Sequence, residues 1–117
     1  MSAMKTLAFV LAISAPLAAQ AQDLAKGDAI KAAVSGNTVQ GSMTESGVYT
    51  EFYAADGTIK AADYSGTWTV EGDKMCFSYG DAPDCWDVRI KGEMITWVQD
   101  GVDGGTGTVV PGNPNEF

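Results

Sequence analysis

The chain has 117 residues, of which 15 are acidic and 7 are basic, and its formal net charge at neutral pH is −8. An acidic protein of this kind repels nucleic acid and anionic membranes, so we expect neither as a partner; a charged partner would be a basic protein or a cation. The sequence contains no histidine, which excludes Ser-His-Asp and Cys-His catalysis and removes the usual proton-transfer group at neutral pH.

Residues 1–21 have the three parts of a secretory signal peptide. A lysine precedes a short apolar run, and small residues follow up to Ala21. This pattern predicts cleavage after Ala21 and a periplasmic or secreted protein, and the run is too short for a good membrane span. We expect one small domain over residues 22–110 and a C-terminal tail over residues 111–117, which lies along the surface or remains mobile.

A short helix is predicted within residues 24–34. Ile30, Ala33 and Val34 fall on one face at helical spacing, and Gly36 supplies the glycine that commonly ends a helix. After Gly36 the period changes, because β-branched and aromatic residues now alternate with polar ones and turn residues recur at short intervals.

This second pattern predicts an all-β fold, an antiparallel meander of about eight strands that forms a small barrel or half-barrel with one short N-terminal helix. Closure is favoured because it removes unpaired strand edges, which gives a monomer. An open sheet with fewer strands, dimerising through its edge, fits the pattern nearly as well. The strands are expected near residues 37–43, 47–54, 58–64, 66–70, 74–79, 85–90, 94–99 and 105–110.

One turn sets the register of the central hairpin. If Gly72-Asp73 is a two-residue turn, Val70 faces Met75 and Trp68 faces Phe77. The apolar residues of both strands then share one face, whereas a slip of one residue would scatter them.

Two further turns are predicted in the same way. Asp56-Gly57 has the composition of a two-residue hairpin turn. Lys91-Gly92 is taken as the turn of the next hairpin, which places Val88 opposite Ile95 on the apolar face.

The cysteines, Cys76 and Cys85, are the only two in the chain. With a turn at Gly80-Asp81 they lie opposite each other on the face away from the apolar residues, and in an exported protein we expect them to form a disulfide. A redox pair would normally have C-x-x-C spacing, and a zinc site would need further nitrogen or sulfur ligands. A labile redox switch or a free thiol pair remain as alternatives.

We expect no catalytic residue, no cofactor and no metal. An enzyme would have to use carboxylates and tyrosines, and the candidate carboxylates on or beside strands are Glu45, Glu51, Asp63 and Asp87. Polar residues that alternate outward on a strand are mostly solvated, so a non-enzymatic protein is favoured.

The glycine-rich stretch of residues 99–105 contains Asp100 and Asp103. An ordinary hairpin loop is favoured over a weak cation site, because the alternating acidic groups and closing glutamate of a calcium loop are missing.

Aromatic residues are the other candidates for a binding function. The tyrosines are expected at the rim or surface, because their hydroxyls need partners. An eight-stranded barrel of this size is expected to fill its interior with its own side chains, and an aromatic-lined ligand cavity is the alternative. The candidate binding surface is Ser46, Tyr49, Tyr53 and Tyr64, and the candidate interior aromatics are Trp68, Phe77, Trp86 and Trp97.

Several segments together carry a resemblance. The mature part contains SGNTV, EFYAADGT, YSGTWTVEGDKMCFSY and GTGTVVPGN, and it resembles a group of small exported bacterial proteins of unknown function. This resemblance implies an extracytoplasmic location and a disulfide between the two cysteines. The domain is also distantly similar to small periplasmic barrel inhibitors of lysozyme. SGVYTEFY, which starts at Ser46, resembles their inhibitory loop, whose serine is expected to enter the cleft of the enzyme.

We therefore expect a non-enzymatic exported binding or accessory domain. One alternative is a periplasmic inhibitor of a basic hydrolase such as lysozyme, which an acidic surface would suit. The other is a carrier of a small apolar molecule with an aromatic-lined barrel interior.

Overall fold

The computed structural model describes residues 23–117, so the predicted signal peptide lies outside the described residues. In these residues, no helix has the length and apolar character needed to cross a membrane. The described part contains one helix and eight strands. They are α2 (Gly27–Val34), β1 (Asn37–Met43), β2 (Gly47–Tyr53), β3 (Thr58–Lys60), β4 (Ser65–Glu71), β5 (Lys74–Ser78), β6 (Asp84–Lys91), β7 (Met94–Gln99) and β8 (Val102–Val110).

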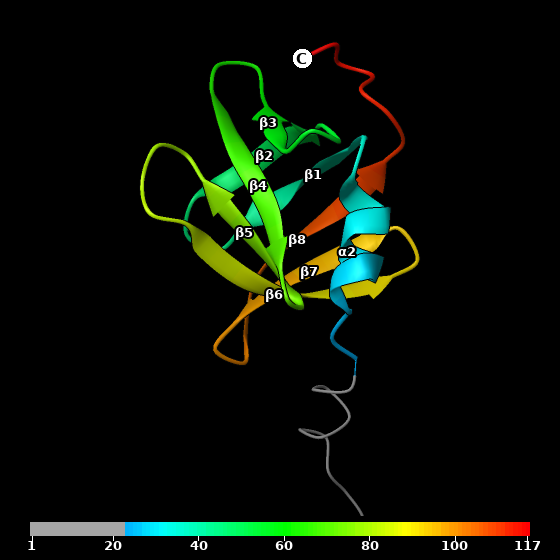
Figure 1. Ribbon diagram of the computed structural model, residues 1–117, viewed down its shortest axis with the longest axis vertical. Coiled ribbons are helices and arrows are strands. Elements are labelled where there is room, and N and C mark those ends of the chain that lie inside the picture. Colours follow the sequence, from blue (N-terminus) through cyan, green and yellow to red (C-terminus); the bar gives the residue numbers. More distant parts are fainter. Residues whose placement is uncertain (1–22) are drawn as a thin grey trace, which may run out of the picture.

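The strands form a closed antiparallel barrel in chain order (Figure 1). Each strand pairs with the next, and β1 pairs with β8 to close the barrel, with Val39 opposite Val109. The predicted all-β meander with one short helix is therefore confirmed. The open-sheet alternative is wrong, because the first and last strands pair with each other and leave no terminal edge.

The hairpin of β4 and β5 has the predicted register. Glu71 faces Lys74 across a two-residue turn, so Val70 faces Met75. Gly72 has a φ of +61°, which suits the first central position of a hairpin turn in which only glycine is at ease.

In the hairpin of β6 and β7, the pairing of the two strands is shifted by two residues from the predicted register. Lys91 faces Met94, so the turn is Gly92-Glu93 and Val88 lies opposite Trp97 rather than Ile95. The reason is that Gly92, with a φ of +62°, again takes the first position of the turn. Because side chains alternate with a period of two, a shift of two residues leaves every side chain on its predicted face, and the apolar face is the predicted one.

The β2–β3 connection is also longer than predicted. The amide of Gly57 donates to the carbonyl of Ala54 (3.0 Å), and the amide of Ala54 donates to the carbonyl of Thr58 (2.8 Å). Asp56 accepts a hydrogen bond from the amide of Thr58 (3.0 Å). This side-chain turn, followed by Gly57 at a φ of +97°, replaces the predicted two-residue turn with a loop that ends in a glycine bulge.

Helix α2 covers one end of the barrel. Ile30 and Val34 are fully buried and belong to the same core as Val39 and Val88 inside the barrel. The amide of Gly27, in the first turn of the helix, donates to the carboxylate of Asp73 in the β4–β5 turn (2.7 Å). In an antiparallel meander the connections alternate between the two ends. The helix therefore shares its end with the β2–β3, β4–β5 and β6–β7 connections, and the other four connections surround the opposite end.

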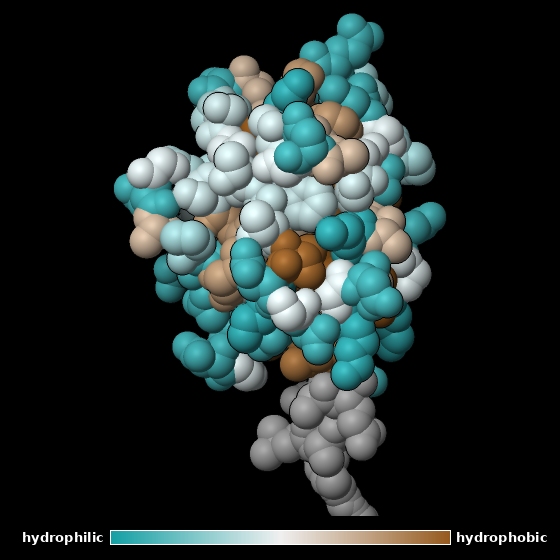
Figure 2. Space-filling model, viewed as in Figure 1, coloured by the Kyte–Doolittle hydropathy of each residue, from teal (hydrophilic) through white to brown (hydrophobic). Residues whose placement is uncertain are grey.

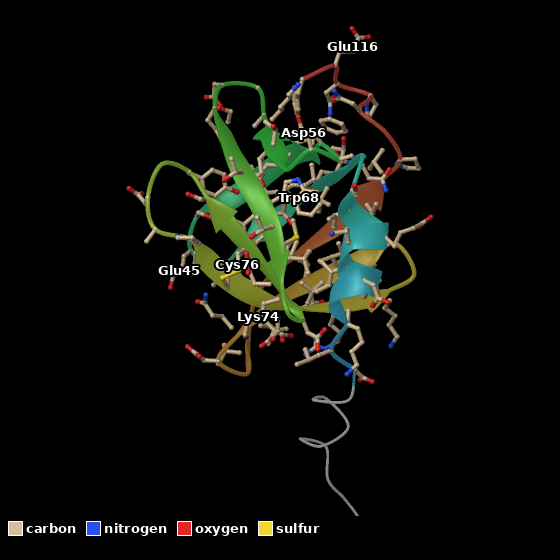
Figure 3. All side chains as sticks on the ribbon, in the orientation of Figure 1. Glu45, Asp56, Trp68, Lys74, Cys76 and Glu116 are labelled. Carbon is tan, nitrogen blue, oxygen red and sulfur yellow. A yellow bond between two sulfur atoms is a disulfide. The ribbon has the colours of Figure 1, made fainter. Side chains whose placement is uncertain are left out.

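The disulfide joins Cys76 and Cys85, which face each other on β5 and β6. Both the predicted bond and its register are confirmed. Cys76 lies on the β5 ribbon near the middle of the barrel wall (Figure 3).

The C-terminal tail, residues 111–117, is attached to β1. The hydroxyl of Thr38 donates to the carbonyl of Gly112 (2.7 Å), and the amide of Gly112 donates to the side chain of Asn37 (3.0 Å). Of the two predicted alternatives, the tail takes the one that lies along the surface.

Candidate functional site

The end of the barrel opposite α2 contains a partly open cavity of about 640 Å³. The prediction of an interior filled by its own side chains is therefore correct for the helix end and wrong for this end. The cavity is lined by Met43, Ser46, Val48, Tyr49, Glu51, Tyr53, Tyr64, Ser65, Phe77, Tyr79, Asp81, Ala82, Asp84, Trp86 and Trp97. The face of the molecule shown in Figure 2 is mostly polar, and its apolar side chains are scattered. The aromatic side chains in the lining make the cavity a candidate site for an apolar ligand.

The short strand β3 explains why this end is open. The strand ends at Lys60, and β2 pairs with it only at Phe52 and Tyr53. The predicted strand of residues 58–64 is too long, because Ala61 and Tyr64 form a turn in which the Ala61 amide donates to the Tyr64 carbonyl (3.0 Å). The first part of β2 consequently has no β3 neighbour, and side chains close the wall beside it.

Those side chains meet at Glu51, which is only 5% exposed. The hydroxyl of Tyr53 donates to Oε1 (2.7 Å), and that of Tyr64 donates to Oε2 (2.6 Å). The hydroxyl of Tyr79 lies 3.1 Å from Oε1 and 2.9 Å from Oε2. We call Glu51 with its three tyrosines the Tyr-Glu cluster. It draws together β2, the β3–β4 connection and the β5–β6 connection, so it fixes the shape of the cavity wall.

The tyrosines of the cluster are held in their protonated form. Burial, followed by the negative charge of Glu51 and the hydrogen bond to it, raises the pKa of Tyr53 well above its ordinary value. The same causes raise the pKa of Tyr64 and of Tyr79. All three phenols are therefore neutral donors at neutral pH, and they solvate the carboxylate without neutralising it.

A second chain of hydrogen bonds crosses the cavity floor. Trp97 Nε1 donates to the hydroxyl of Tyr49 (2.9 Å), and that hydroxyl donates to the carbonyl of Thr106 (2.9 Å). Burial raises the pKa of Tyr49 to about 12, although the hydrogen bond from Trp97 acts in the opposite direction. Tyr49 reaches β8 because Gly107 has no side chain: a Cβ there would collide with the Tyr49 hydroxyl.

All four residues of the candidate binding surface line the cavity. Ser46 and Tyr64 are exposed at its mouth, and Tyr49 is partly buried. Tyr53 differs from the prediction, because it is 1% exposed and belongs to the core. Its hydroxyl finds a partner in Glu51 rather than in water, so the expectation that a tyrosine hydroxyl needs the surface does not hold here.

Three of the four candidate interior aromatics also line the cavity, namely Phe77, Trp86 and Trp97. Trp68 lies within the packed part of the barrel (Figure 3). Its Nε1 donates to the carbonyl of Ala54 (2.9 Å), which satisfies its polar atom away from the cavity.

The candidate carboxylates are dispersed. Asp87 pairs with Lys74 (3.0 Å), and Glu45 and Asp63 are exposed; Figure 3 shows Glu45 pointing away from the barrel. Of the four, Glu51 alone lines the cavity.

The two aspartates of the predicted glycine-rich loop do not form a cation site with other acidic groups. The loop is shorter than predicted, because Gln99 faces Val102 across a two-residue turn. Asp103 therefore lies on β8, where it pairs with Arg89 (3.3 Å). Asp100 adopts a φ of +54°, as expected for a turn residue. Within residues 23–117, no group of three or more His, Cys, Asp and Glu residues is arranged to hold a metal ion.

Two features of the site differ from the prediction or were absent from it. Glu51 was predicted to be an outward, solvated residue, although it stands between Tyr49 and Tyr53 at a spacing of two and therefore shares their inward face. The role of Tyr79 has no local signal, because it depends on a contact with Glu51 that is remote in sequence.

Comparisons with protein-family models, curated proteins and solved structures find no match. The resemblance to small exported proteins and lysozyme inhibitors therefore stays a prediction, and the function must be argued from the site.

Proposed function

We propose that this protein is a non-enzymatic, exported binding protein that holds a small molecule in the cavity at the open end of its barrel. The observation that carries the proposal is the cavity itself, about 640 Å³ in volume and lined by aromatic side chains. Protein sites for small molecules usually have volumes of roughly 300–1,000 Å³.

The composition of the lining supports a ligand with an apolar body. Phe77, Trp86 and Trp97 come from three adjacent strands, and Met43 adds a flexible apolar side chain. Phe77 and Trp97 pack edge to face, with ring centroids 5.2 Å apart. Such rings offer large contact areas at a small cost in side-chain entropy.

A few polar groups would orient the ligand. The Tyr-Glu cluster lies on one side of the cavity, and Asp84 at the mouth accepts a hydrogen bond from Trp86 Nε1 (3.2 Å). A mostly apolar wall with a few fixed polar groups is the usual arrangement in a small-molecule site. The hydrogen bonds also hold the wall in shape before a ligand arrives, which lowers the cost of binding.

The disulfide supports the exported location, because such bonds persist in oxidising compartments. It ties β5 to β6 beside the connection that forms part of the cavity mouth. The bond therefore steadies the mouth as well as the fold.

The proposal is tested with N-phenyl-1-naphthylamine, an uncharged apolar dye whose fluorescence rises in apolar surroundings. We expect one dye molecule to bind per protein. Ala82→Trp, which places a bulky ring at the exposed mouth, should weaken binding at least tenfold.

The matched control is Ala55→Trp, because Ala55 is also exposed but lies in the β2–β3 connection at the helix end. This variant should bind the dye as the parent does. The proposal is wrong if the parent binds neither this dye nor a charged apolar probe. It is also wrong if the two tryptophan variants weaken binding equally, since the dye would then sit elsewhere.

A further inference from the structure

The charge of the cavity narrows the class of ligand. Its lining includes three carboxylates, from Glu51, Asp81 and Asp84, and none of its lining residues is lysine or arginine. A site whose charged groups are all carboxylates repels anions and attracts cations, and its low-dielectric walls strengthen both effects.

Glu51 gives the cavity a buried charge without a counterion. The ion pairs of residues 23–117 are those of Lys74 with Asp87 and of Arg89 with Asp103, and neither includes Glu51. Its hydrogen bonds come from phenols whose raised pKa keeps them neutral. Neutral donors stabilise a buried carboxylate but leave its net negative charge in place, so the carboxylate still attracts a cation placed near it.

The aromatic walls favour the same kind of ligand. Trp86 and Trp97 line the cavity together with Tyr49 and Phe77. Aromatic rings attract cations at their faces, and tryptophan does so most strongly. Since an ammonium group with apolar substituents is weakly hydrated, it also loses little water on entering such a site.

We propose that the cavity binds an organic cation, with an ammonium group near Glu51 and an apolar body against the aromatic wall. This inference rests on the proposed function and specifies its ligand class. A neutral ligand would leave the charge of Glu51 without a counterion, and an anion would add to it. An organic cation satisfies both the carboxylate and the apolar lining.

The test compares two molecules of the same shape. Benzyltrimethylammonium carries a positive nitrogen, and in neopentylbenzene a carbon atom replaces that nitrogen. Binding is followed by the fluorescence of Trp86 and Trp97 and by displacement of N-phenyl-1-naphthylamine. We expect the cation to bind at least tenfold more tightly than its neutral isostere.

The outcomes separate this inference from the proposed function. If the dye binds and the isostere displaces it as well as or better than the cation does, the cavity is a binding site and the cationic preference is wrong. If the dye, the cation and the isostere all fail to bind, the proposed function is wrong and the inference falls with it.

Two variants locate the source of the preference. Glu51→Gln removes the charge of Glu51 and keeps an oxygen acceptor for the tyrosines, so the ratio of cation to isostere affinity should fall by at least about threefold, toward the residual preference that Asp81, Asp84 and the aromatic rings supply. An unchanged ratio in a folded Glu51→Gln protein would overturn the assignment of Glu51.

If Glu51→Gln does not fold, Asp81→Asn supplies the second test, because Asp81 is exposed at the mouth. It should weaken cation binding about two- to threefold and leave isostere binding unchanged. Asp28→Asn, an equal change in net charge on the exposed face of α2, should have no effect. Equal effects of the two variants would show a general charge effect and would contradict a site at this mouth.

Discussion

Replacing Tyr53 with phenylalanine tests the Tyr-Glu cluster most simply, because it removes one oxygen atom. The Tyr53 hydroxyl is 2.7 Å from Glu51 Oε1, and the residue is 1% exposed, so water cannot take its place. The aromatic ring would keep its edge-to-face packing on Trp68 and Phe77, whose centroids lie 6.2 and 6.1 Å away.

The expected cost follows from these contacts. A hydrogen bond to a charged group contributes about 1.5–3 kcal/mol. Oε1 of Glu51 would still have Tyr79 at 3.1 Å, so we expect Tyr53→Phe to lower the free energy of unfolding by about 2 kcal/mol. In a domain of this size such a loss lowers the melting temperature by about 10 °C.

Tyr64→Phe is the matched control. Tyr64 donates to the same carboxylate at 2.6 Å, but it is 44% exposed, so water can replace its hydroxyl and the cost should stay near 0.5 kcal/mol. Urea denaturation followed by circular dichroism gives both values. A Tyr53→Phe protein that is as stable as the parent, or more stable than Tyr64→Phe, would refute the view that buried phenols stabilise Glu51.

Three further predictions concern the disulfide, the cavity floor and alkaline pH. Replacing both Cys76 and Cys85 with serine should lower the free energy of unfolding by about 2.5–3 kcal/mol, because the disulfide closes a loop of about ten residues. Dye binding should persist in this variant. Unchanged stability in urea together with lost dye binding would contradict a structural role for the disulfide. Gly107→Ala should cost about 1–3 kcal/mol in the same assay, because the added methyl group displaces the Tyr49 hydroxyl; a neutral effect would show that the hydrogen-bond chain can shift freely. The raised pKa of Tyr53 means that the folded state keeps a proton that the unfolded chain loses near pH 10. The contribution of Tyr53 to stability is therefore complete below pH 10 and is lost as the pH rises toward the pKa of Tyr53 in the folded state. The free energy of unfolding should therefore fall above pH 10 by about 1.4 kcal/mol per pH unit for each such tyrosine. For Tyr49 this fall should end near its pKa of about 12. Urea titrations that give the same stability at pH 9, 10 and 11 would disprove this.

The parts of the fold that could be predicted are those with local signals. Gly72 marks a tight turn, and the alternation on either side of it fixes the register of β4 and β5. The same alternation places Cys76 opposite Cys85. The predicted turn at Lys91-Gly92 was wrong by one residue, which shifts the pairing of β6 and β7 by two residues. The sequence alone does not determine whether a glycine occupies the first or the second position of its turn.

The site was harder to predict because it depends on contacts between distant segments. Strand alternation predicts which aromatic residues line the cavity. The opening, however, arises because β3 ends at Lys60. The following segment contains no residue whose type predicts that end. The alternation of β2 places Glu51 on the inward face, but its hydrogen bonds depend on Tyr64 and Tyr79, which lie in two connections distant in sequence. Packing at the open end of a barrel is a property of all its strands together.

The central claim, that the cavity binds a small molecule, is tested most directly by native mass spectrometry of the mature protein, purified gently at low salt. We predict an added mass of roughly a few hundred daltons, as expected for a small-molecule site, which is absent from Ala82→Trp and present in Ala55→Trp. A bare protein that also fails to take up benzyltrimethylammonium, or a stable complex with a whole basic protein in place of a small molecule, would contradict the claim.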